Sequence, residues 1–201
     1  AMRKIIEEIA FTLPHRADFK GFIWIPERQE GRLILKSIYD LSLDYGLSRD
    51  FKGVSPEIEQ TSSEFHRGFL RGLFDADGTV IGSQQKGVSV RLSQSNIALL
   101  ESVQRMLHRL GVVSTIYRNR HKARKKSLPD GQGGYDEYDT KANHELSISG
   151  ANLVEFVDKV GFVDVEKIER LDALMQSYRR RLNRERFVDE IVSVVPQGQS
   201  L

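Results

Sequence analysis

Side chains along residues 88–93 alternate between apolar and polar, in the order Val, Ser, Val, Arg, Leu, Ser. A period of two is typical of a strand that has one buried face and one wet face. Residues 79–81 form a second short segment rich in β-branched side chains. Together the two segments predict a β-hairpin around Gly82 and Gly87.

Residues 97–110 follow a helical period instead, with five leucine and valine side chains on one face. A Ser-Asn pair precedes this segment and a glycine follows it, which are typical start and stop signals of a helix. Residues 61–64 (Thr-Ser-Ser-Glu) are a second helix start, because Ser and Thr cap helix N-termini. The helix that follows is predicted to run to about Asp75, and Gly78 ends it.

The remaining segments carry shorter patterns of the same two kinds. Further helices are predicted at residues 3–10, 38–45 and 151–160, with one or two more in 165–186. Further strands are predicted at residues 21–26, 32–36, 112–118 and 145–149, with a strand-like segment at 187–195. Residues 47–60 are a connector. The 25 or so residues between the strands at 112–118 and 145–149 exceed what a hairpin needs, so we expect this connection to be functional or mobile.

From residue 63 onward the predicted order is helix, strand, strand, helix, strand, strand, helix. Such an order indicates an α+β fold with an antiparallel four-stranded sheet. One face of the sheet is expected to be covered by helices, and the other face to be polar.

Composition narrows the class of protein. The chain has 201 residues, no cysteine, and 39% hydrophobic and 29% charged residues. A thiol nucleophile and a thiolate metal site are therefore excluded, and no apolar run approaches the length of a membrane span. We expect an intracellular, cytoplasmic protein with no membrane partner.

Charge adds a local signal. The net charge of +2 favours no particular partner, but Arg118–Lys126 contains six Arg and Lys residues and no acid. A block of one sign is typical either of a solvated loop or of a phosphate-binding surface.

The helix predicted to begin near residue 63 has two unusual features. Gly68, Gly72 and Ala76 lie four residues apart, although each internal glycine costs a helix about 1 kcal/mol relative to alanine. A stripe of small residues lets a second helix approach closely. Asp75 and Asp77 end the helix although acids oppose the macrodipole there, so we expect a cation nearby. Alternatively, the glycines pack against a strand and the acids form a polar turn.

Residues 69–78 (Phe-Leu-Arg-Gly-Leu-Phe-Asp-Ala-Asp-Gly) resemble the LAGLIDADG motif of homing endonucleases. The order of helix, hairpin, helix, hairpin and helix is similar to the αββαββα half-domain of that family. Residues 147–153 and 160–162 resemble the endonuclease domains embedded in inteins. Residues 51–56 resemble the linker before a second motif, and residues 187–199 resemble the return to a splicing domain.

The resemblance implies a site-specific double-strand DNA endonuclease that hydrolyses phosphodiesters with divalent metal ions, normally Mg²⁺. Two motif helices pack through their small residues, here Gly68, Gly72 and Ala76, and each supplies one acid to the metal ions. By position in the motif, the catalytic and metal-binding acid is Asp77, while Asp75 caps the helix or supports the structure around it.

Lysines near the scissile phosphates form part of the same family pattern. Lys52 and Lys167 match these lysines, although both positions are also compatible with ordinary surface residues.

The same resemblance implies that the polar face of a saddle-shaped sheet contacts double-stranded DNA, since a two-stranded ribbon fits the major groove. The candidates for base contacts are Gln84, Gln85, Lys86, Ser89, Arg91, Ser93, Tyr117 and Arg118. The candidates for phosphate contacts are Arg120, Lys122, Arg124, Lys125 and Lys126.

The chain departs from the intein endonuclease pattern because it contains one intact motif copy rather than two. We interpret residues 1–60 as a partial or degenerate first half with its linker, 61–186 as the endonuclease domain, and 187–201 as the segment leading toward a splicing domain. The single motif fits a homodimer that uses Asp77 twice, a fragment that lost the first motif, or a degenerate copy; we favour the homodimer.

Two other functions compete with cleavage. The first is a catalytically inactive LAGLIDADG-fold protein that binds DNA or RNA, such as a regulator or a maturase. The second is an unrelated α+β enzyme in which the Asp-Ala-Asp-Gly turn is a coincidence. An intact Asp77 favours the endonuclease, and the missing second acid favours the inactive binder.

Overall fold

The structure is a computed structural model, and it describes residues 2–28, 30–48, 51, 53–129, 134–179, 181–182 and 192–195. Its N-terminal segment contains α1 (Met2–Thr12), β1 (Ile23–Ile25), the 3-10 helix η1 (Pro26–Arg28), β2 (Glu30–Arg32) and α2 (Lys36–Asp44). The rest of the described chain contains α3 (Pro56–Glu59), α4 (Ser63–Asp77), β3 (Gly78–Ser83), β4 (Gly87–Gln94), α5 (Ile97–Arg109), β5 (Thr115–His121), β6 (Arg124–Pro129), β7 (Tyr135–Thr140), β8 (Asn143–Ser149), α6 (Asn152–Lys159) and α7 (Val165–Ser177).

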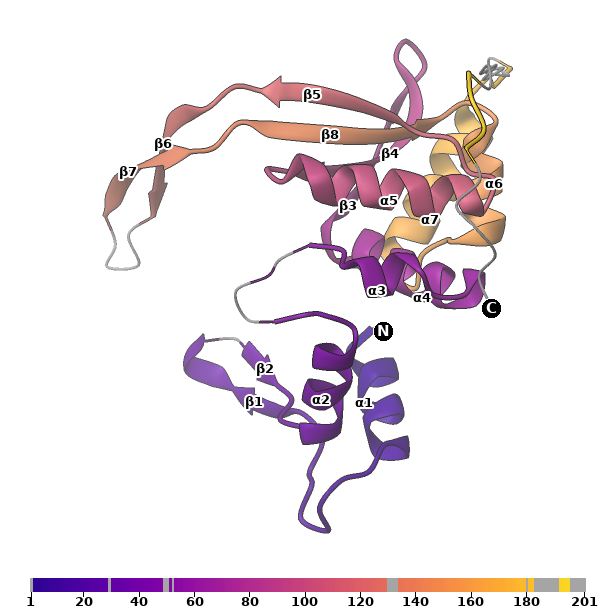
Figure 1. The fold of residues 1–201 in the computed structure, drawn as a ribbon. Coiled ribbons are helices and arrows are strands. Elements are labelled where there is room, and N and C mark those ends of the chain that lie inside the picture. Colours follow the sequence, from indigo (N-terminus) through magenta and orange to yellow (C-terminus); the bar gives the residue numbers. More distant parts are fainter. Residues whose placement is uncertain are drawn as a thin grey trace.

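The α+β class and the antiparallel four-stranded sheet are confirmed. The sheet has the order β3-β4-β8-β5, and every neighbouring pair is antiparallel. Helices α4, α5, α6 and α7 contact this sheet, and Figure 1 shows helices lying beneath it while its upper face is free of them. This matches the expected arrangement of one covered and one polar face.

The alternation along β4 sorts the side chains as predicted. Val88, Val90 and Leu92 are buried on the helix side, where Leu92 pairs with Leu146 of β8. The main core joins this face to the inner sides of the helices. Its fully buried large side chains include Leu70, Phe74, Leu92, Leu100, Met106, Leu107, Leu146, Ile148, Leu153, Phe156 and Leu171.

The helix start and stop signals are also confirmed. The Ser62 hydroxyl accepts a hydrogen bond from the Phe65 N–H at 3.2 Å and caps α4. The Asn96 side chain accepts from the N–H of Ala98 at 3.0 Å and caps α5. Gly111 follows α5 with a φ of 76°, a left-handed conformation that glycine adopts without a steric penalty.

Several predicted boundaries are wrong. The third strand of the domain lies at Thr115–His121 rather than 112–118, since Val112 is buried in the turn after α5. The predicted strand at 32–36 is replaced by β2 at Glu30–Arg32, whose partner is β1. Residues 187–191 lie outside the described part of the chain, and residues 192–195 carry no strand.

The long connection after residue 118 is ordered where it is described. It contains β6 and β7, which pair antiparallel from Arg124↔Thr140 to Pro129↔Tyr135. Figure 1 shows this ribbon continuing β5 and β8 far beyond the helices. No alternating apolar pattern predicts this ribbon, because its strands contain few apolar residues.

The N-terminal segment is less well packed than the rest. Among the residues between 6 and 48 whose side chains the structure describes, Ala10 is the only hydrophobic one that is buried. Large apolar side chains of this segment, among them Trp24 and Ile34, are about half exposed or more. In Figure 1 the segment lies below α3 and α4, apart from the four-stranded sheet. No described helix is both long and apolar enough to cross a membrane.

Candidate functional site

The chain passes from α4 directly into β3 at Gly78. A Cβ atom at this position would collide with the carbonyl oxygen of Phe74, so any larger residue would force the backbone to shift. The glycine of the motif therefore has a local steric cause. This abrupt turn leaves Asp77 as the last residue of the helix, at the edge of the sheet.

Asp75 is a structural acid. It is 6% exposed, and both of its carboxylate oxygens accept hydrogen bonds from the Val163 N–H at 3.0 Å. One oxygen also accepts from the Asp164 N–H at 3.1 Å. These bonds fasten the C-terminal end of α4 to the loop before α7, which confirms that Asp75 supports the fold.

Lys167 supplies the cation expected at the C-terminal end of α4. Its Nζ donates hydrogen bonds to the carbonyl oxygens of Phe74 at 3.1 Å and Asp75 at 2.5 Å. It also lies 5.9 Å from the centroid of the Phe162 ring. A lysine here offsets the negative end of the helix dipole. Lys52, the other lysine of the predicted site, lies outside the described residues.

Asp77 is exposed, unlike Asp75. Its Oδ2 atom accepts a hydrogen bond from the Gln94 Nε2 atom at 2.8 Å. Gln94 is the last residue of β4 and was not among the predicted site residues. The sequence does contain a signal for Gln94. Val88, Val90 and Leu92 occupy every second position of the strand with apolar side chains, and position 94 continues this series with a polar one.

The donor set around Asp77 suits a hard divalent ion only in part. Among the described residues no group of three His, Cys, Asp or Glu side chains could hold a metal ion. Mg²⁺ is usually bound by one or two carboxylates together with phosphate and water oxygens. A single carboxylate oriented by an amide fits that pattern when a substrate phosphate and a second acid complete the site.

The two glycines of the small-residue stripe on α4 have no close neighbours in the described part of the chain. Gly68 and Ala76 are exposed and Gly72 is half-buried. Among the described residues, a Cβ atom added at Gly68 or Gly72 would meet nothing within 4 Å, apart from the backbone of the helix itself. The glycines therefore do not pack closely against any of the described strands, and within the described residues the stripe is accessible to a second helix.

The polar face of the sheet carries an organised group of charges. The Arg91 Nη1 atom donates to the Glu145 Oε1 atom at 3.0 Å, and the Arg91 Nε atom donates to the Ser89 hydroxyl at 2.9 Å. Arg120 forms an ion pair with the same carboxylate, and its Nε atom lies 3.6 Å from Glu145 Oε1. Ser89 is buried beneath Arg91, whereas Ser93 is exposed.

Other predicted DNA contacts have partners elsewhere. In the turn between β3 and β4, the Gln84 Nε2 atom donates to the Ser177 carbonyl oxygen at 2.5 Å, which ties this turn to the end of α7. Gln85 and Lys86 of the same turn are exposed. Arg118 forms an ion pair of 2.5 Å with Glu101 of α5, so its side chain lies toward the helices.

The basic ribbon strand is partly neutralised by its neighbour. Along β6 and β7, Lys125 pairs in register with Asp139, and its Nζ atom lies 3.6 Å from the Glu137 carboxylate. Lys122 and Arg124 are exposed, and the side chain of Lys126 lies outside the described part. Tyr117 of β5 is about half exposed, and the Arg120 guanidinium lies 5.2 Å from its ring centroid.

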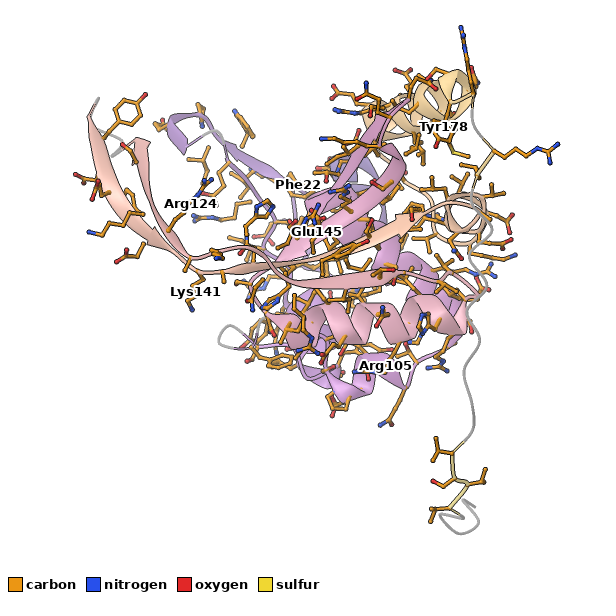
Figure 2. All side chains as sticks on the ribbon, turned by 90° about the horizontal axis from the view of Figure 1, so that it is seen from above. Phe22, Arg105, Arg124, Lys141, Glu145 and Tyr178 are labelled. Carbon is orange, nitrogen blue, oxygen red and sulfur yellow. The ribbon has the colours of Figure 1, made fainter. Side chains whose placement is uncertain are left out.

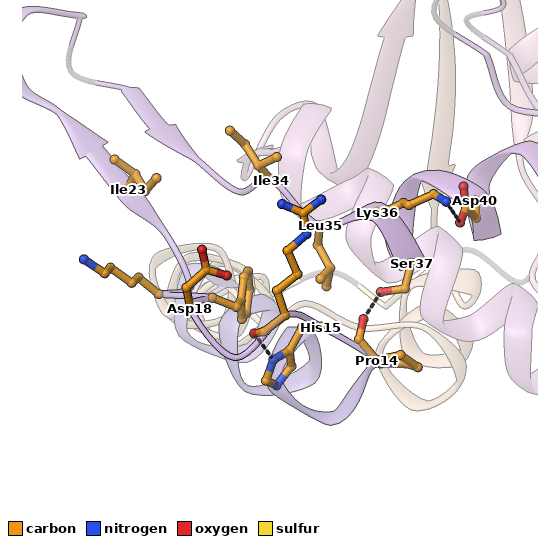
Figure 3. Close-up of a pocket in the computed structure, with 13 residues that line it drawn as sticks. Pro14, His15, Asp18, Ile23, Ile34, Leu35, Lys36, Ser37 and Asp40 are labelled. Atoms are coloured by element: carbon orange, nitrogen blue, oxygen red, sulfur yellow. Dashed lines mark hydrogen bonds and ion pairs between the residues drawn. The ribbon is translucent and has the colours of Figure 1, made fainter.

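A cavity of about 690 Å³ lies in the N-terminal segment, lined only by residues between 14 and 40 (Figure 3). Among the lining residues, the Ser37 hydroxyl donates to the Pro14 carbonyl oxygen at 2.9 Å, and the Lys36 Nζ atom lies 4.0 Å from the Asp40 Oδ2 atom. The cavity contains none of the predicted site residues. The candidate functional site is therefore the end of α4 together with the polar face of the sheet.

Comparison with known families gives the class of this domain. Residues 64–161 match the family model described as LAGLIDADG-like domain. This match spans α4 except its first residue, all four strands of the main sheet, α5 and all of α6. That part of the chain is therefore similar to a LAGLIDADG-like domain.

Particular relatives extend the likeness beyond these residues. The chain is 32% identical over 180 residues to the ribonucleoside-diphosphate reductase NrdEB subunit alpha of Bacillus subtilis, and equally to the protein of that name of Bacillus phage SPbeta. The match covers 86% of this chain and 16% of either relative. An uncharacterized protein of Methanocaldococcus jannaschii is 31% identical over 122 residues, covering 60% of this chain and 42% of that protein.

Among solved structures, variants of the homing endonuclease I-DmoI share 21% identity and a TM-score of 0.47, covering 80% of this chain and 69% of that chain. I-DmoI in complex with DNA and manganese shares 23% identity and a TM-score of 0.41, covering 65% and 56%. Both likenesses are distant.

Proposed function

We propose that this protein is a site-specific DNA endonuclease of the homing type, which hydrolyses both strands of a duplex with divalent metal ions. The observation that carries the proposal is the exposed Asp77 carboxylate at the end of α4, held by Gln94 at 2.8 Å and following an open stripe of small residues. Because the scaffold uses Asp75 and Lys167 to fix this end of the helix, Asp77 is left available for chemistry.

Asp77 would hold the metal, which we propose to be Mg²⁺, because carboxylate, phosphate and water oxygens suit this ion. When bound, such an ion activates water and stabilises the leaving 3′ oxygen of the cleaved strand. Gln94 positions the carboxylate by occupying Oδ2. Lys167 holds the backbone at the end of α4, so we assign it a positioning role beside the reacting phosphate.

The second acid of the site would come from a second copy of the chain. The open stripe at Gly68, Gly72 and Ala76 is where the two α4 helices would meet, each presenting its own Asp77. A homodimer of this kind predicts a roughly palindromic DNA target. The polar faces of the two sheets would then lie over the duplex, and their side chains would read its major groove.

The relatives suggest where such an endonuclease resides. The chain corresponds to 16% of the length of proteins named as ribonucleoside-diphosphate reductase subunits. We propose that it is an endonuclease domain embedded in a host protein, of the kind that inteins carry.

Cleavage of DNA selected by the protein itself tests the proposal. Duplexes are first selected from a library with a randomised core in EDTA, and the bound pool is then incubated with the protein in Mg²⁺. The expected result is cleavage of both strands at one position, which EDTA abolishes. Binding without cleavage in either Mg²⁺ or Mn²⁺ would instead establish the inactive DNA-binding protein. Absence of any duplex binding would overturn both functions.

A further inference from the structure

A buried carboxylate lies on the face of the sheet that we propose contacts DNA. Glu145 of β8 is 5% exposed, although it stands on the polar face, in register with Ser93 of β4 and Tyr117 of β5. Figure 2, which views the molecule from above, shows Glu145 over the body of the sheet. An acid at this place opposes the attraction of phosphates, so a surface built only for phosphate binding would not retain it.

Two arginines cover this carboxylate from the neighbouring strands. Arg91 approaches from β4 with its Nη1 atom 3.0 Å from Glu145 Oε1, and Arg120 approaches from β5 with its Nε atom 3.6 Å from the same oxygen. The side chains of Arg91 and Arg120 are 24% and 48% exposed. The acid is therefore shielded from solvent, and the guanidinium groups remain within reach of a ligand.

Both guanidinium groups are fixed by contacts besides the carboxylate. The Arg91 Nε atom donates to the Ser89 hydroxyl at 2.9 Å, so two of its five N–H donors are engaged and their direction sets the plane of the group. The Arg120 guanidinium lies 5.2 Å from the Tyr117 ring centroid. Such pre-ordering reduces the entropy that a side chain loses when it binds.

We propose that Glu145 is a specificity-determining residue, which holds Arg91 and Arg120 in place to read the edge of a guanine in the major groove. This inference rests on the proposed DNA-binding function and adds the mode of recognition to it. Arginine donates two parallel hydrogen bonds to the O6 and N7 atoms of guanine, and this contact depends on the orientation of the guanidinium plane. The buried acid supplies that orientation.

The proposal separates affinity from specificity. Removing the charge of Glu145 leaves two positive groups without their acid, so attraction to any duplex rises. The same change frees the guanidinium groups, so the preference for the selected sequence falls. A group that contacts only phosphate would change affinity for all sequences alike.

The experiment measures the dissociation constants of a duplex selected from a randomised library and of a scrambled duplex of equal composition, in EDTA. The discrimination ratio is the scrambled value divided by the selected value. For Glu145→Gln we expect the ratio to fall by roughly 5- to 150-fold, the range set by one lost bidentate contact. Affinity for the scrambled duplex should rise by up to about fivefold.

Arg91→Lys keeps the positive charge but loses the planar pair of N–H donors that a guanidinium presents. It should therefore lower the discrimination ratio without changing the salt dependence of binding. Glu155→Gln is the matched control, because Glu155 is an exposed acid of α6 on the helix side, and it should keep the wild-type ratio. Thermal melting of each variant verifies that it is folded.

The outcomes distinguish this inference from the proposed function. If wild-type protein binds a selected duplex and both Glu145→Gln and Arg91→Lys keep its discrimination ratio within twofold, the specificity role is wrong while the DNA-binding function stands. If Glu145→Gln does not fold, Arg91→Lys alone decides the question. If the wild-type protein selects no duplex, the proposed function and this inference both fail.

Discussion

Asp75 and Asp77 lie two residues apart in the sequence, but their surroundings differ and indicate different roles. Asp75 is buried and accepts three backbone hydrogen bonds from Val163 and Asp164, whereas Asp77 is exposed and is held by Gln94. The motif alone assigned the chemistry to Asp77 and support to Asp75. The hydrogen bonds now give the physical reason for the supporting role, because a buried carboxylate needs such donors.

The two acids should therefore differ in their effect on stability. Asp75→Asn replaces one accepting oxygen by an amide that faces backbone N–H groups, so we expect a loss of about 1–3 kcal/mol in the free energy of unfolding. Asp77→Asn should change it by less than about 0.5 kcal/mol. Urea denaturation followed by circular dichroism measures both values. Equal losses in the two variants would contradict this division of roles.

Gly78 offers a second test at this scale. Its backbone φ is ordinary at −74°, so the need for glycine comes from the Phe74 carbonyl oxygen that a Cβ would strike. We expect Gly78→Ala to lower the free energy of unfolding by about 1–3 kcal/mol. Thr79→Val, at the exposed next position, should stay within about 0.5 kcal/mol. A neutral Gly78→Ala in thermal melting would show that the turn has more room than the structure gives it.

At the scale of elements, the sequence predicted those helices and strands whose signals are local. The cap at Ser62, the glycine after α5 and the alternation along β4 each fixed an element from a few neighbouring residues. The ribbon of β6 and β7 was missed because charged and polar residues dominate both strands, and no regular alternation of apolar side chains marks them. The ion pairs of Arg91 and Arg118 were missed for another reason, since their partners Glu145 and Glu101 are distant in sequence.

The open stripe on α4 gives a prediction about helix pairing. If two α4 helices meet there, Gly72→Leu should abolish the dimer of twice 22.9 kDa while each chain remains folded, because a Cβ at this position meets nothing within 4 Å among the described residues outside the helix backbone. Glu155→Leu, equally apolar but on α6, should keep the wild-type mass. Light scattering with and without the selected duplex measures both masses. A Gly72→Leu variant with unchanged mass and activity would refute pairing through the stripe.

The ribbon gives a prediction about salt. We expect Lys125→Gln combined with Lys126→Gln to reduce the slope of log affinity against log salt by about 1–2, close to 0.9 for each lost phosphate contact. Glu137→Gln removes an acid beside Lys125 and should raise affinity instead. Filter binding over a range of salt concentrations measures the slopes. An unaltered slope in the double variant would place this part of the ribbon off the DNA.

For the whole molecule, one well-packed domain carries the proposed chemistry. Residues 53–179 contain the four-stranded sheet and nearly all of the buried core, whereas the segment up to residue 48 buries little and exposes Trp24 and Ile34. The site at the end of α4 and the polar face of the sheet belong to this domain, and the cavity in the N-terminal segment does not. In the proposed homodimer the Asp77 of the second copy completes the metal site, so we expect dimer formation and cleavage to be lost together.

Single-turnover cleavage of the selected duplex by wild-type protein and by Asp77→Asn tests the central claim most directly. The asparagine keeps an oxygen for Gln94 and removes the charge proposed to hold the metal. We expect Asp77→Asn to bind the duplex as tightly as wild type and to cut neither strand in Mg²⁺. Asp158→Asn, which changes an exposed acid of α6, should cut normally. Full cleavage by Asp77→Asn would show that Asp77 does not hold the metal ion.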